Sequence, residues 1–289
     1  YFLSRKYARA QGWLDFDAQV DEEPGLARLK ELLGAYYHVP VSLPKKSKAS
    51  EPKVSRKKSQ KPPKVSVVIP CYNYAHFLTE AVQSVLAQSY RDFEILIVND
   101  GSTDNSRQVA EELIAAHPEV RMTLINQQNS GKPAISRNAG IARARGEYIL
   151  CLDADDAIDP DMLKECVAIL EKEPDVAFVY TDQLYFNEQK TFFQNLCDYD
   201  FDRLKQHNFI GYCSLFRRNA WEDVGGFATD VGYEDWDFWI SLGERGHRGQ
   251  RIAQPLFQYR QHGSGQYQKD LKKDEEIRAR IILRHPDLY

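Results

Sequence analysis

Several features are scarce or missing in this sequence of 289 residues. No run approaches the ~18 consecutive apolar residues that a membrane-spanning helix needs, and no secretory signal pattern opens the chain. The cysteines are odd in number, lack Cys-x-x-Cys spacing and fall mostly inside predicted strands or helices: Cys71, Cys151, Cys166, Cys197 and Cys213. This pattern is typical of buried thiols in a reducing compartment. We therefore expect a cytoplasmic protein without a membrane span.

Negative charge is scarce in one stretch, residues 45–63. Counting the adjoining Lys64, this stretch holds nine Lys and Arg, three prolines and a single acid, Glu51, which is the composition of a linker. Its net charge of +8 leaves −12 on the rest of a chain whose total is −4. A solvated spacer is favoured over a tether to a partner or to anionic lipid, which would be a peripheral membrane contact. Because the stretch contains no aromatic residue, nucleic-acid binding is disfavoured.

Residues 1–44 precede this linker. Leu26, Leu29 and Leu33 recur at helical spacing behind Pro24, which predicts a helix. The segment is too short to enclose a core of its own, and the chain begins with Tyr rather than Met. We expect a helical appendage at the edge of a larger protein, whose other domains are then partners.

From residue 64 onward, predicted strands alternate with predicted helices. The first strands are expected over 65–69, 93–98, 121–126 and 147–152, with helices over 76–89, 106–117 and 133–145 between them. Further strands are expected over 176–180 and 209–216, with an edge strand before Tyr259 and a charged helix over 269–283. This alternation predicts an α/β domain over 64–265, a mostly parallel sheet with helices on both faces, followed by a C-terminal helix over 266–289.

Polar loops follow each of the first four predicted strands, at 70–74, 99–104, 127–133 and 153–156. In parallel sheets, ligands bind where the strands end at their carboxyl side, so these loops should open into one crevice. The last loop carries Asp153, Asp155 and Asp156. Because side chains two apart on an extended segment point the same way, Asp153 and Asp155 can converge on one hard divalent cation. Acidic residues are also common as turn and cap residues, so Asp-x-Asp alone is a weak signal.

The set of side chains in these loops suits a nucleoside diphosphate. Tyr72 offers a flat face for a base, and Asp100 can accept the imide N–H of a pyrimidine. Lys132 and Arg137 lie at the start of a helix, where they can approach phosphate. Each residue alone also fits a structural role in packing, a turn or the surface, and it is their coincidence at four strand ends that favours function.

Four segments, 65–74, 97–104, 136–141 and 146–156, together resemble family 2 glycosyltransferases of GT-A (Rossmann-like) fold, and the resemblance extends over residues 64–265. It implies a nucleotide-sugar donor, with a UDP-sugar first, a Mn²⁺ or Mg²⁺ ion and inversion at the anomeric carbon. The implied nucleotide-binding residues are Pro70, Tyr72, Asn73, Asp100, Lys132, Arg137 and Asp153, with Asp153 facing ribose, and Asp155 is the implied metal ligand. Asn99 departs from the pattern, because the family often carries a second Asp there.

The second half of the domain should supply the acceptor side. Residues 225–227 and 232–239 look like the Gly-Gly-Phe and Glu-Asp-x-Asp segments of the family. The resemblance assigns Asp235 as the general base that takes the proton of the acceptor, with Asp156, Glu234 and Trp236 on the acceptor or sugar side. Charged residues there also suit the start of a helix, and helical spacing puts Trp236 on a buried face.

His262 lies in a Gly-rich loop after the last predicted strand. In related GT-A enzymes a His at this place reaches the metal or the diphosphate, so His262 is the second candidate metal ligand. An ordinary exposed loop histidine fits the position equally well.

Other functional classes stay in competition with glycosyl transfer to a glycan, lipid-linked or protein acceptor. A sugar-nucleotide nucleotidyltransferase would need a Gly-rich basic loop after the first strand, where this chain has Cys-Tyr-Asn-Tyr. A P-loop nucleotidase is excluded, because the residue five before Gly131 is Asn126 rather than Gly. A non-catalytic nucleotide-sugar-binding or scaffold module would be expected to lack Asp155 or Asp235, and both are present.

Overall fold

The computed structural model describes residues 61–187, 190–262 and 273–289. The expected appendage at 1–44 and most of the linker lie outside the described residues. The strands are β1 (Val65–Cys71), β2 (Phe93–Asp100), β3 (Met122–Gln127), β4 (Tyr148–Cys151), β5 (Ala157–Ile158), β6 (Val176–Phe186), β7 (Thr191–Gln194), β8 (Leu215–Arg217) and β9 (Arg248–Arg260). The helices are α3 (Ala75–Leu86), α4 (Ser106–Ala116), α5 (Pro133–Ile141), α6 (Met162–Lys172), α7 (Phe201–Gln206), α8 (Arg218–Asp223), α9 (Glu234–Glu244) and α11 (Asp274–Arg284).

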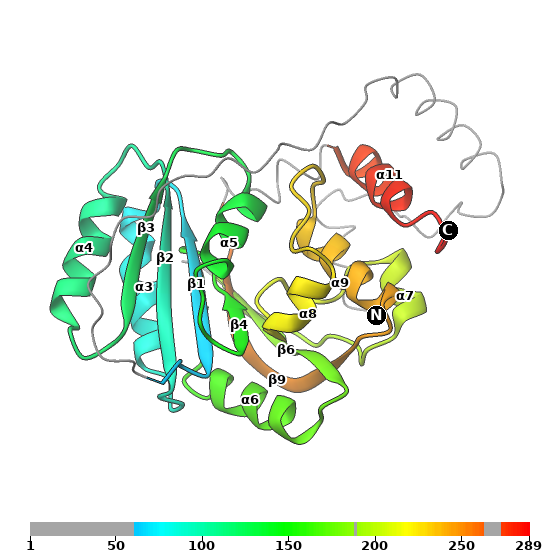
Figure 1. The fold of residues 1–289 in the computed structure, drawn as a ribbon, viewed down its shortest axis with the longest axis horizontal. Coiled ribbons are helices and arrows are strands. Elements are labelled where there is room, and N and C mark those ends of the chain that lie inside the picture. The colour runs from blue at the N-terminus through cyan, green and yellow to red at the C-terminus, as the bar shows by residue number, and fades with distance from the viewer. Residues whose placement is uncertain (1–60, 188–189, 263–272) are drawn as a thin grey trace. The chain divides into compact units, whose positions relative to one another are not determined.

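The strands form one mixed sheet in the order β3-β2-β1-β4-β8-β6-β9-β5, with β7 paired to β6 outside this path (Figure 1). The first four strands are parallel neighbours. Beyond β4 the direction changes, because β8 pairs antiparallel with both β4 and β6. The α/β sheet flanked by helices that the sequence predicts, mostly parallel, is therefore confirmed. Its parallel pairs are those among β1–β4 and the pair of β6 with β9.

Helices cover both faces of the sheet, as the alternation predicted. One core joins α3, α4 and α6 to strand residues such as Val67 and Ile95. The other core joins α5, α8 and α9 to their neighbours Val68 and Leu96, whose side chains point to the opposite face. A continuous β-branched run such as Val65–Ile69 is therefore buried on both sides, and the four parallel strands can end together at one edge.

The structure departs from the expected elements in the second half. The expected strand over 209–216 is wrong for most of its length, because only β8 is extended. Gly211 lies in the preceding loop, and a Cβ there would stand 2.3 Å from Gln183 Nε2. The strand expected over 176–180 continues to Phe186, where it pairs with β7 and β9. β9 is an inner strand rather than an edge strand, because the short β5 pairs with its outer side.

Two predictions from composition can be checked in the described residues. The five cysteines are free thiols, and four of them are buried. No helix in the described ranges is long and apolar enough to cross a membrane.

Candidate active site

The loops after β1 and β2 are joined by Asn73. Its backbone is left-handed, with φ 58°, and its side-chain Oδ1 accepts hydrogen bonds from the backbone N–H of Thr103 (2.8 Å) and of Asp104 (3.3 Å). The Asn73 N–H in turn donates to Ser102 Oγ at 3.1 Å. Beside this joint, the ring of Tyr72 is 46% exposed. These hydrogen bonds of Asn73 fix the backbone of both loops. They leave the Tyr72 ring accessible to a ligand, next to Pro70 at the end of β1.

Asp100 organises the loop after β3. Its carboxylate accepts hydrogen bonds from Gln127 Nε2 (2.6 Å), from the Ser130 N–H (3.0 Å) and from Ser130 Oγ (2.8 Å). The next residue, Gly101, has φ +67°, and a Cβ there would stand 2.5 Å from the Asn129 nitrogen, so only glycine fits. The sequence suggested that Asp100 reads a base, and in the structure its carboxylate also holds a turn together.

Arg137 joins the two halves of the domain. It lies on α5 with 4% of its surface exposed. Its Nη2 donates to both carboxylate oxygens of Asp153, at 2.8 and 2.9 Å, and its Nη1 donates to Glu234 at the start of α9. The guanidinium also lies over the Tyr212 ring, 5.0 Å from its centroid. In this structure the buried guanidinium of Arg137 is paired with two carboxylates, and its expected phosphate contact stays a prediction.

α5 also holds the Gly-Gly-Phe loop. Asn138 Nδ2 donates to the Phe227 carbonyl (2.8 Å), and Asn138 Oδ1 accepts from the Phe227 N–H (3.0 Å). Lys132 Nζ donates to the Thr229 carbonyl at 2.6 Å. The helix expected to face phosphate thus carries residues that bind the loop leading to Asp235.

Asp155 and His262 meet at the end of β9. His262 Nε2 lies 2.7 Å from Asp155 Oδ2, and both side chains keep a minor exposed fraction. The rings of Tyr74 and Phe77 lie 5.7 and 5.6 Å from the imidazole. The two residues that the resemblance suggested as metal ligands are therefore adjacent, although they lie 107 positions apart in the chain.

Asp156 has a different environment from Asp155. It is 2% exposed, and it accepts hydrogen bonds from the Tyr212 hydroxyl and from the Arg260 N–H (2.7 Å). Burial, followed by repulsion from Asp155, raises the pKa of Asp156 well above its ordinary value. The enclosed carboxylate links the acidic turn to β9, and the expected place of Asp156 on the acceptor or sugar side stays a prediction.

Asp235 stands in the first turn of α9, next to Glu234. Asn208 Nδ2 donates to its Oδ2 at 3.1 Å. Burial, followed by repulsion from Glu234, raises the pKa of Asp235 from 3.8 to about 6, although Arg137 opposes the change. A carboxylate with this pKa is ionised at neutral pH and is more basic than an ordinary aspartate.

Trp236 is buried in the core that includes α5, α8 and α9. It is 3% exposed, and its indole N–H donates to the Leu204 carbonyl at 2.7 Å. The expected burial of this helix face is confirmed for Trp236, Trp239 and Ile240, and the expected place of Trp236 on the acceptor or sugar side stays a prediction. Asp237 is buried as well, which the helical spacing did not predict.

The donor atoms around the acidic turn can be tested for a metal site. Among the described residues, no group of three or more His, Cys, Asp or Glu side chains is arranged to hold a metal ion. Asp156 is enclosed and Asp153 is paired with Arg137, which leaves the Asp155 carboxylate and the His262 imidazole as protein donors. Mg²⁺ is usually bound by one or two carboxylates together with substrate phosphates. The residues therefore fit a Mg²⁺ or Mn²⁺ ion whose remaining ligands come from a diphosphate and water.

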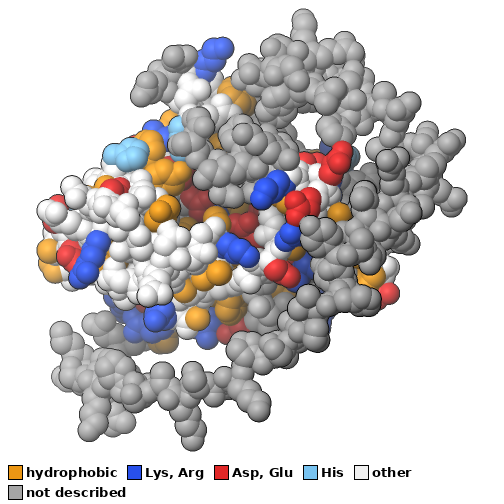
Figure 2. Space-filling view, turned by 90° about the horizontal axis from the view of Figure 1, so that it is seen from above, with side chains coloured by type: hydrophobic (Ala, Val, Ile, Leu, Met, Phe, Trp, Pro, Cys, Tyr) orange, Lys and Arg blue, Asp and Glu red, His pale blue; other side chains and the backbone are white. Residues whose placement is uncertain are grey.

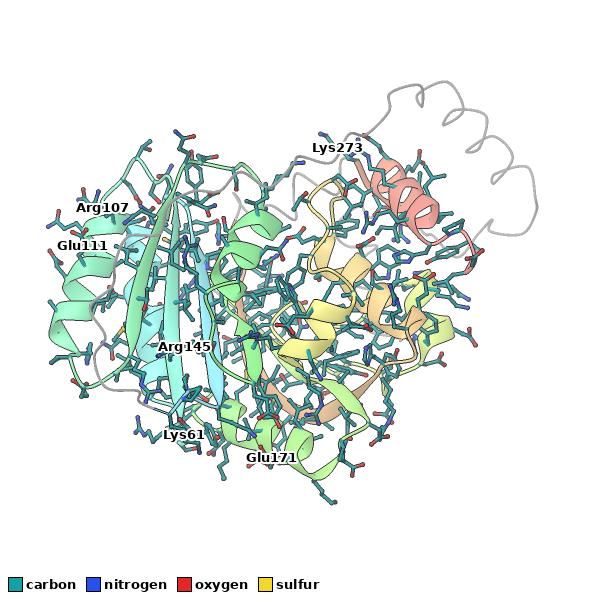
Figure 3. All side chains as sticks on the ribbon, viewed as in Figure 1. Lys61, Arg107, Glu111, Arg145, Glu171 and Lys273 are labelled. Carbon is teal, nitrogen blue, oxygen red and sulfur yellow. The ribbon has the colours of Figure 1, made fainter. Side chains whose placement is uncertain are left out.

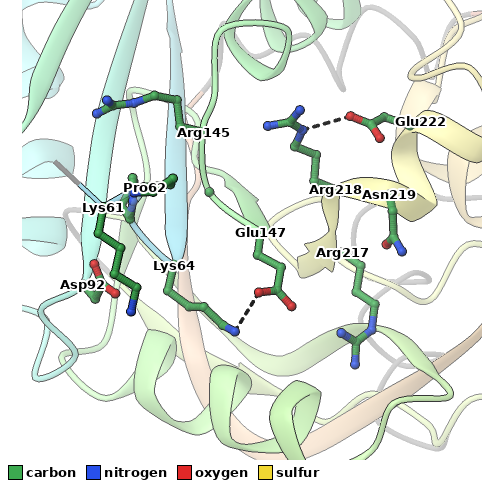
Figure 4. Close-up of a pocket in the computed structure, with 12 residues that line it drawn as sticks. Lys61, Pro62, Lys64, Asp92, Arg145, Glu147, Arg217, Arg218, Asn219 and Glu222 are labelled. Carbon is green, nitrogen blue, oxygen red and sulfur yellow. Dashed lines mark hydrogen bonds and ion pairs between the residues drawn. The ribbon is translucent and has the colours of Figure 1, made fainter. Parts of the chain in front are cut away.

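The space-filling view onto the carboxyl ends of β1–β4 shows acidic side chains in a hollow with hydrophobic surface beside it (Figure 2). A cavity of about 520 Å³ lies at the other end of the sheet, where the strands begin. Figure 3 labels Lys61, Arg145 and Glu171 at that end. The charged residues lining the cavity include the ion pairs Lys64–Glu147 and Arg218–Glu222 (Figure 4). This cavity is remote from the acidic turn, and we assign the chemistry to the carboxyl ends.

Three contacts in this site were not predicted from the sequence, those of Tyr212, Arg260 and Asn208. Arg260 Nε donates to the Asp155 carbonyl at 2.8 Å, and its guanidinium lies between the rings of Phe77 and Phe186. Its position two residues before His262 was the available signal. Tyr212 and Asn208 belong to no sequence motif. They reach the site from the loop before β8, which has no regular structure.

Comparison with known proteins gives consistent results. The sequence model of the family described as "Glycosyl transferase family 2" matches residues 66–225. The chain is 32% identical over 188 residues to chondroitin synthase of Escherichia coli, covering 64% of this chain and 27% of that protein. It thus spans about a quarter of that relative.

Solved structures share the fold. S. aureus TarS in complex with UDP-GlcNAc has a TM-score of 0.61 at 21% identity, covering 70% of this chain and 60% of that one. The mannosyltransferase PcManGT from Pyrobaculum calidifontis, in complex with GDP-Man and Mn²⁺, has a TM-score of 0.58 at 22% identity, covering 73% of this chain and 61% of that one. At these identities the likeness concerns the fold alone. With the family match extending over more than half of its length, the chain belongs to glycosyl transferase family 2.

Proposed function

We propose that this chain transfers a sugar from a nucleotide diphosphate donor to a hydroxyl of an acceptor, with inversion, and that the transfer depends on Mn²⁺ or Mg²⁺. The observation that carries the proposal is the double ion pair of Arg137 with Asp153 and Glu234. It brings the N-terminus of α9, and with it Asp235, beside the acidic turn after β4. The turn that suits a diphosphate and the carboxylate that suits a base thus belong to one site.

Donor binding falls to the strand-end loops. Tyr72 has an exposed ring that can stack on a base, and Asp100 stands at the end of the neighbouring strand. The Asp153 side chain is 30% exposed beyond its ion pair with Arg137, so it can still accept a hydrogen bond from a ribose hydroxyl. Asn73 and Pro70 shape the loop that carries Tyr72. The complex of TarS with UDP-GlcNAc supports a UDP-sugar as the first donor to test.

Asp155 and His262 would hold the metal ion against the diphosphate. When bound, the ion supplies positive charge that stabilises the leaving nucleotide. The Mn²⁺ of the mannosyltransferase complex supports this assignment. Because Arg137 is paired with Asp153 and Glu234, its positive charge is already balanced by carboxylates, and a bound cation would supply positive charge for a diphosphate.

Asp235 would act as the general base. Inversion requires the acceptor hydroxyl to attack from the side opposite the leaving diphosphate, while a carboxylate on that side removes its proton. The raised pKa of Asp235, about 6, suits this role. The Asn208 amide, which donates to Asp235, orients the carboxylate. The name of the chondroitin synthase relative favours a glycan acceptor over a lipid-linked or protein acceptor.

The test is a screen of nucleotide-sugars for metal-dependent thermal stabilisation, followed by assays of donor hydrolysis and of transfer to oligosaccharides. A ligand at ~100 times its Kd adds about 2.7 kcal/mol to stability, and for a domain of this size the melting temperature should rise by roughly 5–10 °C. Asp155→Asn should lose the response to metal. If no nucleotide-sugar shifts the melting point, or the variant responds like the wild type, the proposal fails; binding without any turnover would indicate a non-catalytic module.

A further inference from the structure

The turn before α9 has an unusual backbone. Tyr233 directly precedes the helix with φ 50° and ψ 48°, a left-handed conformation that a bulky residue rarely adopts. No side chain caps the helix. Such a conformation persists only where the surroundings hold it. The position matters, because Glu234 and Asp235 follow at once, so the direction of both carboxylates depends on this residue.

α11 supplies contacts that hold this turn. The Tyr233 hydroxyl donates to Asp274 Oδ1 at 3.0 Å. Ile277 lies against Gly232, where a Cβ would stand 2.5 Å from Ile277 Cδ1. Asp274 and Ile277 are three residues apart and so share one face of α11. This face is packed on the turn that precedes the base.

The same face of α11 continues along the turn. Arg280 Nη1 donates to the Asp230 carbonyl at 2.8 Å, and the Arg278 guanidinium lies over the Trp236 ring, 4.9 Å from its centroid. Four residues of α11 thus contact the chain between Asp230 and Trp236. Figure 1 shows α11 beside the end of α9 that carries the acidic residues.

A second set of contacts fixes α9 itself. Asp237 is 1% exposed, and its Oδ1 accepts from Arg284 Nε at 2.9 Å and lies 3.3 Å from His285 Nε2. The other ring nitrogen of His285, Nδ1, lies 2.8 Å from Glu244 Oε2 at the last residue of α9. Burial lowers the pKa of His285, but hydrogen bonds with Asp237 and Glu244 outweigh it, and the pKa is raised overall. His285 therefore ties the first and last turns of α9 to the end of α11.

We propose that α11 is a positioning element of the transfer site, in which Asp274 and Tyr233 set the direction of the base Asp235. This inference rests on the proposed base function of Asp235. The turn and α11 lie beyond residue 225, where the family match ends. Tyr233 and Asp274 act through the backbone of α9 and are positioning residues, because neither is assigned a contact with substrate.

The test removes the hydrogen bond without removing the helix. Asp274→Ala should lower kcat for sugar transfer about tenfold, since small displacements of a reacting group carry large rate costs. Asp274→Asn keeps an oxygen acceptor and should restore the rate to within about threefold. Glu275→Ala is the matched control, because this neighbouring carboxylate is exposed on α11. Donor affinity, measured by metal-dependent thermal shift with UDP-sugar, should stay within about twofold in all three variants, because the strand-end loops are untouched.

A second variant covers the case in which Asp274→Ala fails to fold. Tyr233→Phe keeps the ring and loses only the hydroxyl, and it should show the same loss of kcat. In the double variant the two effects on kcat should be less than additive, because both changes remove the Tyr233–Asp274 hydrogen bond, while Asp274→Ala also removes the contact of Asp274 with Arg278 Nε at 2.7 Å. A lowered melting temperature with wild-type kcat in these variants would overturn the inference, since α11 would then only stabilise the fold.

Failure of the proposed function would look different. If the wild-type protein neither binds a nucleotide-sugar nor transfers one, the transferase proposal fails. Hydrogen exchange then decides the positioning role: amides of residues 230–237 should exchange faster in Asp274→Ala than in Glu275→Ala. Equal exchange in the two variants would overturn the inference, whatever the activity.

Discussion

The two halves of the domain hold their functional residues in place by different means. In the β1–β4 half, neighbouring parallel strands deliver loops to one edge, and short hydrogen bonds such as those of Asn73 and Asp100 join adjacent loops. In the second half, the sheet is mixed and the candidate base lies on a helix, held by buried charged groups. Regular topology therefore gathers the residues proposed to bind the donor, whereas ion pairs distant in sequence orient the helix that carries the proposed base.

Arg137 connects the two halves of the domain through its ion pairs. It belongs to the first half by sequence and pairs with carboxylates of both halves. A buried ion pair contributes little net stability compared with apolar packing, but its geometry is specific. We infer that the Arg137 pairing fixes the relation between the two halves.

The largest loss of activity is expected when the proposed base in the second half is removed while the donor loops of the first half stay intact. Asp235→Asn should lower transfer by about 10³-fold, within the range for loss of a general base, and leave donor binding unchanged. Its melting temperature at pH 8 should rise, because a carboxylate destabilised by burial and by Glu234 is replaced with a neutral group. Initial rates and thermal melts check this, with the exposed Asp202→Asn as control. Retention of a tenth of the activity would exclude Asp235 as the base.

Breaking the link between the halves should have the next largest effect. Arg137→Met leaves Asp153 and Glu234 without their partner, and loss of one partner of a buried pair costs about 3 kcal/mol. For a domain of this size the melting temperature should fall by roughly 6–12 °C. Arg143→Met, which alters an exposed arginine shortly after α5, is the control. An unchanged melting temperature would show that the halves do not depend on this contact.

Neighbouring aspartates of the acidic turn should respond differently. Asp155→Asn should lower activity by roughly 10²-fold, as expected for loss of one electrostatic contact to a leaving group, and abolish the response of donor binding to Mn²⁺. Asp156→Ala should instead cost about 1–3 kcal/mol of stability, because the Tyr212 hydroxyl and the Arg260 N–H lose their acceptor. Urea unfolding and Mn²⁺ titration distinguish the two. Identical behaviour would refute the division of roles between them.

The pH dependence should be the smallest effect at neutral pH. Because the pKa of Asp235 is raised to about 6, the ionised base is lost as the pH falls through 6, and kcat/KM should drop about tenfold per unit below that point. Falling pH should act on stability in the opposite direction from its action on the rate. The pKa of this carboxyl is higher in the folded state than in the unfolded state, so protonation between pH 6 and 4 favours the folded state. A rate profile that stays flat down to pH 5 would contradict this assignment.

Prediction from the sequence worked best where one physical pattern dominates. The β-branched run at 65–69, the strand at 93–98 and the helix beginning at Ser106 all agree with the structure to within a few residues, because burial on both faces of a sheet requires such runs. The loop over 209–214 looked like a strand, but its apolar residues pack without extended pairing. The motifs predict Asp156 and Trp236 on the acceptor or sugar side, and the structure encloses both in residues that come from elsewhere in the chain.

The sequence by itself determined the alternation of strands and helices, the family, and the gathering of four polar loops at one edge, because each follows from local periodicity and from motifs that lie within short segments. Only the tertiary structure decided which carboxylate pairs with Arg137, that Asp156 is a buried link while Asp155 meets His262, and that α11 packs on the turn before Asp235. The reason is that the partner of a charged side chain depends on distance and desolvation in the folded state, and residues a hundred positions apart contribute to both.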